Sequence, residues 1–317
     1  MTGDTALGPG AEFDAIRLLV RRWGARARGI GDDAAVVSVP RGDLLVASVD
    51  SAVEGRHFKR DWLSPREIGY RAVAAALSDL AAMAARPLGV LVALTLPEAW
   101  RAELLDLADG IGEAVDAAGT TIIGGNLSDG DRLGITTTVL GSAFAPLRRD
   151  GARAGDRVYV TGRLGGPAAA LRLLAEGKLA GSVGGPYRER FVNPVPRLAE
   201  GRWLAEHGAS AAIDISDGLI GDLRHLAAAS GVDVEIDAAR VPRLDDVGVE
   251  DALRSGEEYE LVTTAPAPFD TEAFAARFGI PLTEIGTVAG APRDARSTVH
   301  VHGARVAPLE GYDHFSR

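Results

Sequence analysis

The sequence predicts a protein of the α/β class with two domains, and three observations support this. Predicted strands alternate with predicted helices along most of the 317 residues. A chain of this length corresponds to about two domains. Residues 146–156 are polar, rich in glycine and arginine, and have no apolar periodicity. We therefore expect an N-terminal α/β domain over residues 1–145 and a C-terminal α/β domain over residues 146–317.

The N-terminal domain should begin with an amphipathic helix over residues 13–23, because apolar side chains recur there at helical spacing. A β-hairpin is expected next, with strands over residues 29–39 and 44–49 joined by the turn at residues 40–43.

A serine cap starts the next helix. Ser64 is followed by a proline and, three residues later, by Glu67, which is a typical capping pattern. This helix should run to about Ala85, where Pro87 ends it. The remaining elements of the domain are a strand at 88–96, a helix at 98–118 and strands at 120–123 and 133–144.

The C-terminal domain opens with a strand from Val158 that leads through a glycine turn, residues 162–166, into a helix. A glycine turn before a helix either binds phosphate oxygens or is only a tight turn, and both readings stay open. The other expected elements are helices at 193–207, 219–229 and 270–278, a short helix ending at Ser255, and strands starting at 211 and spanning 232–236, 259–264, 283–288 and 298–301.

Composition excludes several classes of function. The net charge is −10 without a basic patch, so nucleic acid is not an expected partner. The chain has no cysteine, which excludes disulfides, thiolate nucleophiles and thiolate metal sites and makes a cytoplasmic location the default. We expect no signal peptide and no membrane partner, because neither an apolar leader nor an apolar run of about 20 residues is present.

Two well-known routes to ATP are also excluded. The only lysines are Lys59 and Lys178, and neither follows the glycine-rich pattern of a P-loop. The His-Arg-Asp catalytic loop of protein kinases is missing as well. If the protein uses ATP, carboxylates and metal ions must handle the phosphates.

Acidic residues recur at the ends of the predicted strands and helices. The first pair follows residues 29–31, where two glycines allow close approach of the backbone to a ligand. Converging carboxylates repel one another unless a cation lies between them, and Mg²⁺ prefers oxygen ligands. The sequence therefore suggests a magnesium–phosphate site built from Asp32, Asp33, Asp50, Asp79, Asp214, Asp217, Glu257 and Glu258.

Structural explanations compete with this hypothesis at each position. Two aspartates after a glycine are common in solvated turns. Asp79 lies either against a metal or on the solvent face of its helix. Ser216 or Asp217 could simply cap the helix that follows. The histidines with ordinary explanations are His57, in a loop, and His300 and His302, which alternate on a strand.

Six motifs, in one order over nearly the whole chain, resemble those of thiamine-monophosphate kinase. The last of them, Tyr-Asp-His-Phe, separates this family from its relatives aminoimidazole ribonucleotide synthetase, selenophosphate synthetase and a hydrogenase maturation protein. The motifs are Gly-Ile-Gly-Asp-Asp-Ala-Ala at 29–35, Glu-Gly-Arg-His-Phe at 54–58, Leu-Ser-Asp-Leu-Ala-Ala-Met at 77–83, Asp-Ile-Ser-Asp-Gly-Leu at 214–219, Gly-Glu-Glu-Tyr-Glu-Leu at 256–261 and Gly-Tyr-Asp-His-Phe at 311–315.

The resemblance implies a two-domain fold like that of aminoimidazole ribonucleotide synthetase, in which N-terminal strands build a barrel across a homodimer. It implies ATP bound with several Mg²⁺ ions, and direct in-line transfer of the γ-phosphoryl group to thiamine monophosphate, giving thiamine diphosphate and ADP. Metal ions that bridge two anionic phosphates suit this chemistry, and no protein nucleophile is required.

The resemblance also implies roles for the matched residues, and none of them acts as a catalytic group. An acidic group and an aromatic face suit the cationic thiazolium of the substrate. Magnesium would be held by Asp33, Ser48, Asp50, Asp79, Asn126, Asp214 and Asp217, ATP would contact Gly125, Asn126, Arg149 and Ser216, and thiamine monophosphate would contact His57, Glu257 and Tyr312.

The chain departs from the family pattern in several places. Asn126 stands where the family has an aspartate, so it offers an oxygen without a charge, and one magnesium ion should bind more weakly. The other departures are Val49 for a threonine, Ala84 for a glycine, Glu258 for an aspartate and Gly166-Pro167 for a polar pair. These departures bear on the rate and the number of metal ions more than on the class of reaction. Two further functions stay open: another ATP-dependent enzyme of the superfamily and, because of Asn126, a non-catalytic protein that binds nucleotide or thiamine phosphate.

Overall fold

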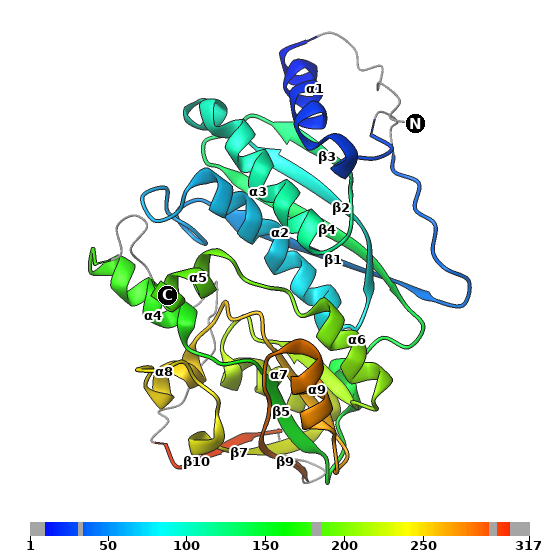
Figure 1. Cartoon of the computed structure of the whole chain (residues 1–317), viewed down its shortest axis with the longest axis vertical. Helices are drawn as coiled ribbons and strands as arrows, with labels where there is room; N and C mark the ends of the chain where they lie inside the picture. Colours follow the sequence, from blue (N-terminus) through cyan, green and yellow to red (C-terminus); the bar gives the residue numbers. More distant parts are fainter. Residues whose placement is uncertain (1–9, 31–33, 179–184, 292–296, 305–317) are drawn as a thin grey trace. The chain divides into compact units, whose positions relative to one another are not determined.

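The structure is a computed structural model that describes residues 10–30, 34–178, 185–291 and 297–304 (Figure 1). The chain forms two compact units. The first comprises Met1–Leu80 and Arg86–Phe144, and the second comprises Ala81–Ala85 and Ala145–Arg317. Each unit contains a mixed β-sheet with helices packed against it, so the prediction of a two-domain α/β fold is confirmed.

The described part of the first unit contains a four-stranded sheet in the order β1-β4-β2-β3. Strand β4 is antiparallel to both of its neighbours, and β2 and β3 are parallel. The strands are β1 (Leu44–Val53), β2 (Arg86–Thr95), β3 (Ile122–Ser128) and β4 (Gly134–Ala143).

Helices cover one face of this sheet (Figure 1). Two of them approach closely because glycines face the neighbouring backbone: a Cβ on Gly110 would lie 1.8 Å from the Arg66 carbonyl oxygen, and one on Gly69 would lie 2.3 Å from the Leu107 carbonyl oxygen. The helical elements are α1 (Ala11–Trp23), η1 (Gly24–Arg26), α2 (Pro65–Ala82), η2 (Glu98–Glu103) and α3 (Leu104–Ala117).

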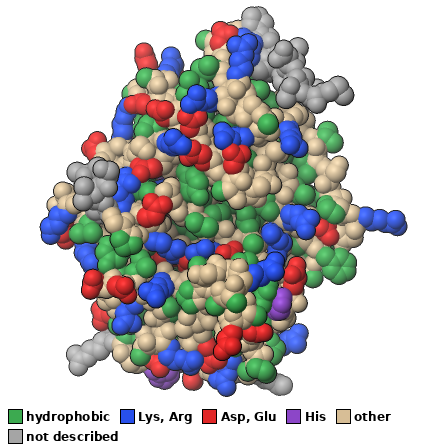
Figure 2. Space-filling model, viewed as in Figure 1, with side chains coloured by type: hydrophobic (Ala, Val, Ile, Leu, Met, Phe, Trp, Pro, Cys, Tyr) green, Lys and Arg blue, Asp and Glu red, His purple; other side chains and the backbone are tan. Residues whose placement is uncertain are grey.

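Side chains anchor α1 on α3. The indole Nε1 of Trp23 donates to the Ala108 carbonyl oxygen over 2.8 Å, and Arg22 Nε donates to Asp109 Oδ1 over 2.6 Å. Many of the arginines are paired in this way, and Figure 2 shows basic and acidic side chains interspersed on the visible face.

The capping pattern predicted for α2 is confirmed. The Ser64 amide donates to Glu67 Oε2 over 2.8 Å, and the Glu67 amide donates to Ser64 Oγ over 3.3 Å. The helix ends at Ala82 rather than Ala85, because Ala84 adopts a left-handed conformation with φ of 55°. Strand β2 then starts at Arg86 and includes Pro87.

The predicted hairpin of residues 29–39 with 44–49 is wrong for the part that the structure describes. Residues 34–40 contain no strand, and β1 pairs with β4, which is some 90 positions further along the chain. The valine run of residues 36–37 suggested a strand, but Val36 is 98% exposed and belongs to neither sheet of the described residues. Residues 31–33 lie outside the described part.

Strand β3 extends further than predicted. It continues past Ile123 to Ser128 because it pairs with β2 along its whole length. Gly125 makes this pairing possible, since a Cβ there would lie 1.9 Å from the Val92 carbonyl oxygen. Asn126 is therefore on a strand rather than in a loop.

The second unit contains a six-stranded sheet of described residues in the order β10-β7-β9-β5-β8-β6. Only the pair β10 and β7 is parallel within it. The strands are β5 (Arg157–Thr161), β6 (Ala211–Asp214), β7 (Val232–Asp237), β8 (Leu261–Ala265), β9 (Leu282–Gly290) and β10 (Val299–His302).

Apolar side chains of this sheet and of α7 form the core of the second unit, with Leu223, Leu226, Val234 and Val262 fully buried. The helical elements are η3 (Arg149–Gly151), α4 (Gly166–Ala175), α5 (Gly185–Val192), α6 (Leu198–Glu206), α7 (Leu219–Ser230), η4 (Ala238–Arg240), α8 (Val249–Arg254) and α9 (Thr271–Phe278).

One predicted helix of the second unit starts too early. The helix expected over residues 193–207 begins only at Leu198, because Pro194 and Pro196 keep the preceding residues out of the helical conformation. A separate helix, α5, ends just before this stretch and was not predicted. Within the described residues, no helix combines the length and the apolarity needed to cross a bilayer.

Candidate active site

Three predicted metal ligands lie on two neighbouring elements of the first unit. Ser48 Oγ, on β1, donates a hydrogen bond to Asp79 Oδ2, on α2, over 2.5 Å. Asp50 is two residues after Ser48 and therefore points to the same face of β1. Asp79 is half-buried, so it does not lie on the open solvent face of its helix. The structure thus brings Ser48, Asp50 and Asp79 to one face of the sheet.

A buried hydroxyl without a partner lies in the same row of the sheet. Thr137 is opposite Asp50 in the β1–β4 pairing and is fully buried. Its Oγ1 has no hydrogen-bond partner among the described residues. A buried polar atom of this kind is costly unless a ligand or water satisfies it, so the position fits a site for a polar group.

Gly125 and Asn126 lie at the opposite edge of the sheet. The register runs from Asp50 through Thr137 and Val92 to Gly125, which is three strand spacings, or about 14 Å. Measured along the sheet, Asp50 and Asn126 therefore lie on opposite edge strands.

The loop that carries His57 is fixed by hydrogen bonds. The Val53 amide donates to His57 Nδ1 over 3.0 Å, so the neutral ring carries its proton on Nε2. Glu54 Oε2 accepts from Trp100 Nε1 over 3.0 Å and from the Leu133 amide over 3.2 Å. Sequence reasoning did not assign this role to Glu54, because its partners are far away in the chain.

A cluster of acidic side chains lies before α7 in the second unit. Asp214 ends β6 and is 4% exposed, and Ser216 and Asp217 follow in the loop. The N-cap of α7 is Gly218, and no side chain caps the helix from that position, so the capping explanation for Ser216 and Asp217 does not hold.

Asp222 was missed by the sequence analysis and organises this loop. Its Oδ2 accepts hydrogen bonds from the amides of Ser216 and Asp217, both over 3.1 Å. Burial, followed by the charges of Asp214 and Asp217, raises the pKa of Asp222 to about 8. The signal in the sequence that could have identified Asp222 is an aspartate among the apolar residues at the start of the helix predicted for residues 219–229.

Glu257 lies beside the same loop. Its amide donates to the Ser216 carbonyl oxygen over 2.8 Å, and a Cβ on the preceding Gly256 would lie 2.6 Å from that oxygen. Glu257 and Tyr259 both have positive φ angles, 56° and 53°, which residues with side chains rarely adopt. The structure therefore brings Glu257 together with Ser216 and its acidic neighbours.

Arg149 is not part of this cluster. Its carbonyl oxygen accepts from Ser230 Oγ, over 2.7 Å, at the C-terminal end of α7, whereas Ser216 precedes the N-terminal end. A helix of 12 residues is about 18 Å long, so Arg149 and Ser216 lie at different ends of it. Asp32, Asp33 and Tyr312 lie outside the described residues.

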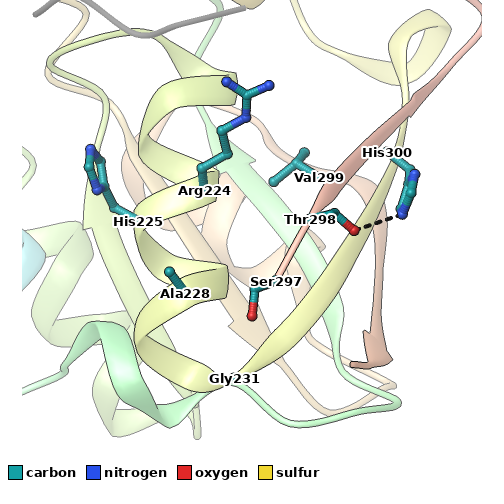
Figure 3. A pocket seen from close by; sticks show the side chains of 8 residues that line it. All are labelled: Arg224, His225, Ala228, Gly231, Ser297, Thr298, Val299 and His300. Carbon is teal, nitrogen blue, oxygen red and sulfur yellow. Dashed lines mark hydrogen bonds between the residues drawn. The ribbon is translucent and has the colours of Figure 1, made fainter. Parts of the chain in front are cut away.

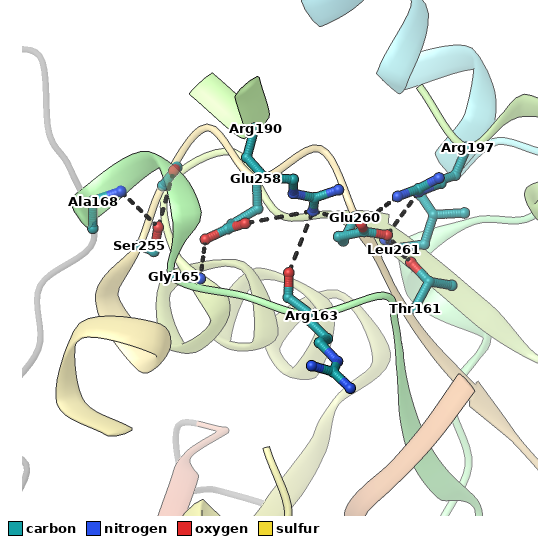
Figure 4. A network of polar contacts seen from close by, with 11 residues as sticks. Thr161, Arg163, Gly165, Ala168, Arg190, Arg197, Ser255, Glu258, Glu260 and Leu261 are labelled. Atoms are coloured by element: carbon teal, nitrogen blue, oxygen red, sulfur yellow. Dashed lines mark hydrogen bonds and ion pairs between the residues drawn. The ribbon is translucent and has the colours of Figure 1, made fainter. Parts of the chain in front are cut away.

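The glycine turn before α4 is closed by another loop (Figure 4). The Gly165 amide donates to Glu258 Oε1, and the Ala168 amide, in the first turn of the helix, donates to Ser255 Oγ over 3.2 Å. Pro167 has no N–H to offer. Of the two readings of this turn, the structure supports the tight turn, because a carboxylate occupies the end where phosphate oxygens would bind.

A buried ion-pair network lies next to this turn (Figure 4). Glu260 is fully buried and accepts from Arg197 through two bonds of 2.8 and 2.5 Å, from Arg190 over 2.6 Å and from Thr161 Oγ1 over 2.6 Å. Burial alone would raise the pKa of Glu260, but the two arginines outweigh it and lower the pKa. The absence of a side chain at Gly162 leaves room for the Glu260 carboxylate, because a Cβ on Gly162 would lie 2.3 Å from Glu260 Oε1.

A cavity of about 830 Å³ lies elsewhere, between α7 and β10 (Figure 3). His225, on α7, and His300, on β10, both line it, and their rings point away from each other. His300 Nε2 is 2.8 Å from Thr298 Oγ1, and His302 Nε2 is 3.9 Å from Glu235 Oε2. His300 and His302 are exposed, which agrees with the ordinary explanation given for them from the sequence.

Within residues 10–30, 34–178, 185–291 and 297–304, no three Asp, Glu, His or Cys side chains converge closely enough to hold a metal ion by themselves. Magnesium does not require such a cage, because it commonly binds one or two carboxylates and completes its coordination with water and substrate phosphates. The pairs of oxygen ligands described above are of this kind.

Two family models match the chain. Residues 31–143 match the N-terminal domain of AIR synthase related proteins, and residues 153–298 match the C-terminal domain of the same proteins. Thiamine-monophosphate kinase from Escherichia coli K12 is 36% identical over 306 residues, covering 91% of this chain and 92% of that protein. The enzyme from Bacillus subtilis is 33% identical over 323 residues, covering 96% and 99%.

Solved structures give the same result. The crystal structure of thiamine-monophosphate kinase from Stenotrophomonas maltophilia K279a has a TM-score of 0.82 and 36% identity, covering 92% of this chain and 97% of that one. AaThiL, complexed with AMPPCP and TMP, has a TM-score of 0.76 and 30% identity, covering 96% and 97%. The hydrogenase maturation protein HypE, in complex with ATP, shares the fold with a TM-score of 0.75 at 21% identity.

Proposed function

The chain belongs to the thiamine-monophosphate kinase family, and on that premise we propose how its residues carry out the reaction of the family. The γ-phosphoryl group of ATP is transferred to thiamine monophosphate, which gives thiamine diphosphate and ADP. Both reactants are anionic at the phosphates that must meet, so the protein has to position them and offset their repulsion.

Magnesium ions are assigned to two groups of oxygen ligands. Ser48, Asp50 and Asp79 form the first group, and the support for it is the 2.5 Å contact between Ser48 and Asp79 together with the unpartnered Thr137 hydroxyl beside Asp50. Bound magnesium would neutralise phosphate charge in the ground state and the transition state. The second group is Asp214 and Asp217, and further ligands are Asp33 and Asn126.

The protein side chains bind and orient the reactants, and none forms a covalent intermediate. Transfer is direct and in line, because one phosphate oxygen of thiamine monophosphate is itself the nucleophile. Gly125, Asn126, Arg149 and Ser216 are assigned to ATP. The 18 Å that separate the two ends of α7 mean that Arg149 and Ser216 would contact different parts of the nucleotide. Thiamine monophosphate is assigned to His57, Glu257 and Tyr312.

The first unit is also proposed to form a homodimer through β1. This strand is an edge of its sheet, and an edge strand with apolar side chains invites pairing with another chain. Large apolar residues are exposed there: Leu45 at 54%, Val49 at 62% and, on the neighbouring strand end, Phe144 at 80%. Pairing of two such edges would build a barrel across the dimer. Light scattering of the wild type and of Val49→Asp tests this, with a dimer expected only for the former.

We assign metal–ATP binding and dimerisation to residues 1–145, and binding of ATP and substrate to residues 146–317. The location proposed for this activity, the cytoplasm, rests on composition alone.

The observation that carries the proposal is the convergence of Ser48, Asp50 and Asp79 on one face of the sheet. The test is incubation of the protein with thiamine monophosphate, ATP and MgCl₂, followed by chromatography for thiamine diphosphate. Another ATP-dependent activity would give ADP without thiamine diphosphate. A non-catalytic binding protein would be thermally stabilised by the ligands without turnover. This alternative stays open because Asn126 lacks the charge of the family aspartate.

A further inference from the structure

Glu258 connects three parts of the second unit. It is 3% exposed, and its Oε1 accepts the Gly165 amide at the start of α4. Its Oε2 lies 3.7 Å from Arg190 Nη2, on α5, and has no hydrogen-bond partner among the described residues. Figure 4 shows the carboxylate between these two groups. Burying a carboxylate destabilises the folded state unless other groups compensate, so the buried position of Glu258 needs a structural or functional reason.

The backbone on both sides of Glu258 is held in an unfavourable conformation. Glu257 and Tyr259 have φ angles of 56° and 53°. Such conformations persist only where the surroundings determine them, and they are frequent at functional sites. Three amides tie this segment to the acidic loop before α7: Glu257 donates to the Ser216 carbonyl oxygen over 2.8 Å, and Glu258 and Tyr259 donate to that of Ile215 over 3.1 and 3.0 Å.

We propose that Glu258 is a positioning residue for the reaction: its carboxylate, seated on the Gly165 amide and facing Arg190, fixes the strained segment 257–259 and so directs Glu257 toward thiamine monophosphate. The inference rests on the proposed function, because the contact of Glu257 with the substrate belongs to it. Arg190 acts with Glu258, since the same guanidinium also binds Glu260 over 2.6 Å and thereby connects the segment to the buried network.

The protonation state of Glu258 supplies a readout that a merely structural residue would lack. Burial raises the pKa of Glu258 to about 7, against the opposing effects of Ser255, Arg190 and the Gly165 amide and with a small contribution from Glu260. These are the polar and charged groups that face it from the neighbouring loops, from α5 and from its own segment. Glutamine resembles the protonated glutamate, so the effect of Glu258→Gln should depend on pH.

The experiment compares steady-state kinetics of the wild type, Glu258→Gln and Glu258→Asp at about pH 5.5 and about pH 8.5. At the higher pH we expect the KM for thiamine monophosphate to rise about ten-fold in Glu258→Gln, with the KM for ATP within about two-fold of the wild type. At the lower pH the two proteins should differ by less than about two-fold. Titration of the substrate phosphate affects both proteins equally, so it cancels in the ratio of the KM of Glu258→Gln to that of the wild type at each pH.

Glu258→Asp keeps the charge but withdraws it from the Gly165 amide by one methylene, so its KM for thiamine monophosphate should be raised at both pH values. The matched control is Asp251→Asn, which also turns a carboxylate into an amide and breaks the 2.8 Å pair between α8 and Arg172 of α4. It should keep the kinetics of the wild type.

Several results would overturn the proposal. They are unchanged kinetics in both Glu258 variants, a loss of thermal stability alone, or a Gln effect that is equal at the two pH values. Glu257→Gln separates the two levels of inference. If it leaves the KM for thiamine monophosphate unchanged, the assignment of Glu257 to the substrate fails. If it raises this KM and Glu258→Gln does not, only the positioning role fails.

Discussion

Ser48 on β1 donates its hydroxyl hydrogen to Asp79 on α2 over 2.5 Å, although the two residues are 31 positions apart. This bond fixes the direction of the Asp79 carboxylate, and Asp50 projects from the same face of β1 as Ser48. The pair therefore offers oxygen ligands from a strand and a helix at one place, and it is the most direct target for mutation.

Asp79→Asn should raise the Mg²⁺ concentration for half-maximal activity about ten-fold or more, because it removes a charged ligand and keeps the size of the side chain. The measurement is activity against MgCl₂ at saturating ATP. Asp106→Asn, an exposed aspartate of α3, is the matched control and should not change the requirement. An equal requirement in Asp79→Asn and the wild type would exclude Asp79 as a ligand.

Asn126→Asp should lower the Mg²⁺ concentration needed for half-maximal activity, by several-fold, because a carboxylate binds a hard cation more strongly than an amide oxygen does. An unchanged or raised requirement in Asn126→Asp would count against Asn126 as a ligand.

Ala84→Gly should stabilise the protein by roughly 0.5–1 kcal/mol. Ala84 has a φ of 55°, where a Cβ is strained, and glycine relieves this strain at some cost in the entropy of the unfolded chain. Thermal unfolding at constant ligand concentration measures the change. Ala75→Gly, inside α2, should instead destabilise by about 1 kcal/mol, and a loss of stability in both variants would contradict the strain argument.

Arg197→Met should destabilise the second unit by about 3 kcal/mol, because it leaves the fully buried Glu260 with one arginine instead of two. Arg148→Met is the control: its pair with Asp150 is exposed to solvent, so its loss should change the stability far less than the loss of Arg197 does. Urea unfolding of the two variants distinguishes a buried pair from a surface pair, and similar midpoints would argue against the network.

The free energy of unfolding should depend on Glu258 with a definite sign. Burial raises the pKa of this carboxyl from 4.5 to about 7, so the folded state holds its proton more tightly than the unfolded state does. The resulting stabilisation is complete below about pH 4.5 and is lost as the pH rises through 7, a change of roughly 3 kcal/mol at most.

The glutamine of Glu258→Gln does not titrate in this range. The free energy of unfolding of the wild type should therefore fall, relative to that of Glu258→Gln, as the pH rises through 7. Urea unfolding at a series of pH values measures the difference, with Glu272→Gln, an exposed residue of α9, as the control. A constant difference between the wild type and Glu258→Gln would show that the carboxyl does not titrate in this range.

Local signals in the sequence were sufficient for much of the fold. The capping pattern at Ser64 and Glu67 placed the start of α2 correctly, because both residues act within one helical turn. The valines at residues 36–37 misled the prediction, since strand propensity does not say whether a partner strand exists. Strand β3 was cut short because glycines usually weaken strands, whereas Gly125 is needed there for close approach.

Some residues of the candidate site could be identified from the sequence, and others could not. Asp50 and Asp214 could be selected because they follow apolar runs, and Asp79 because it interrupts the apolar surface of a helix. The partners of Glu260 could not, since Arg197 and Thr161 are 63 and 99 positions away and spacing says nothing about such distances. Asp222 was missed because it lies inside a helix, where its role depends on amides of the preceding loop.

Residues Ala81–Ala85 belong to the second unit, although they lie between two segments of the first. The chain passes from one unit to the other three times, after residues 80, 85 and 144, so neither unit is a continuous stretch of the gene. A fragment that stops near residue 145 would carry five residues whose packing partners are missing, and the complementary fragment would have a gap where they belong. Shuffling the halves between relatives should therefore yield poorly folded chimaeras unless the end of α2 travels with the C-terminal half.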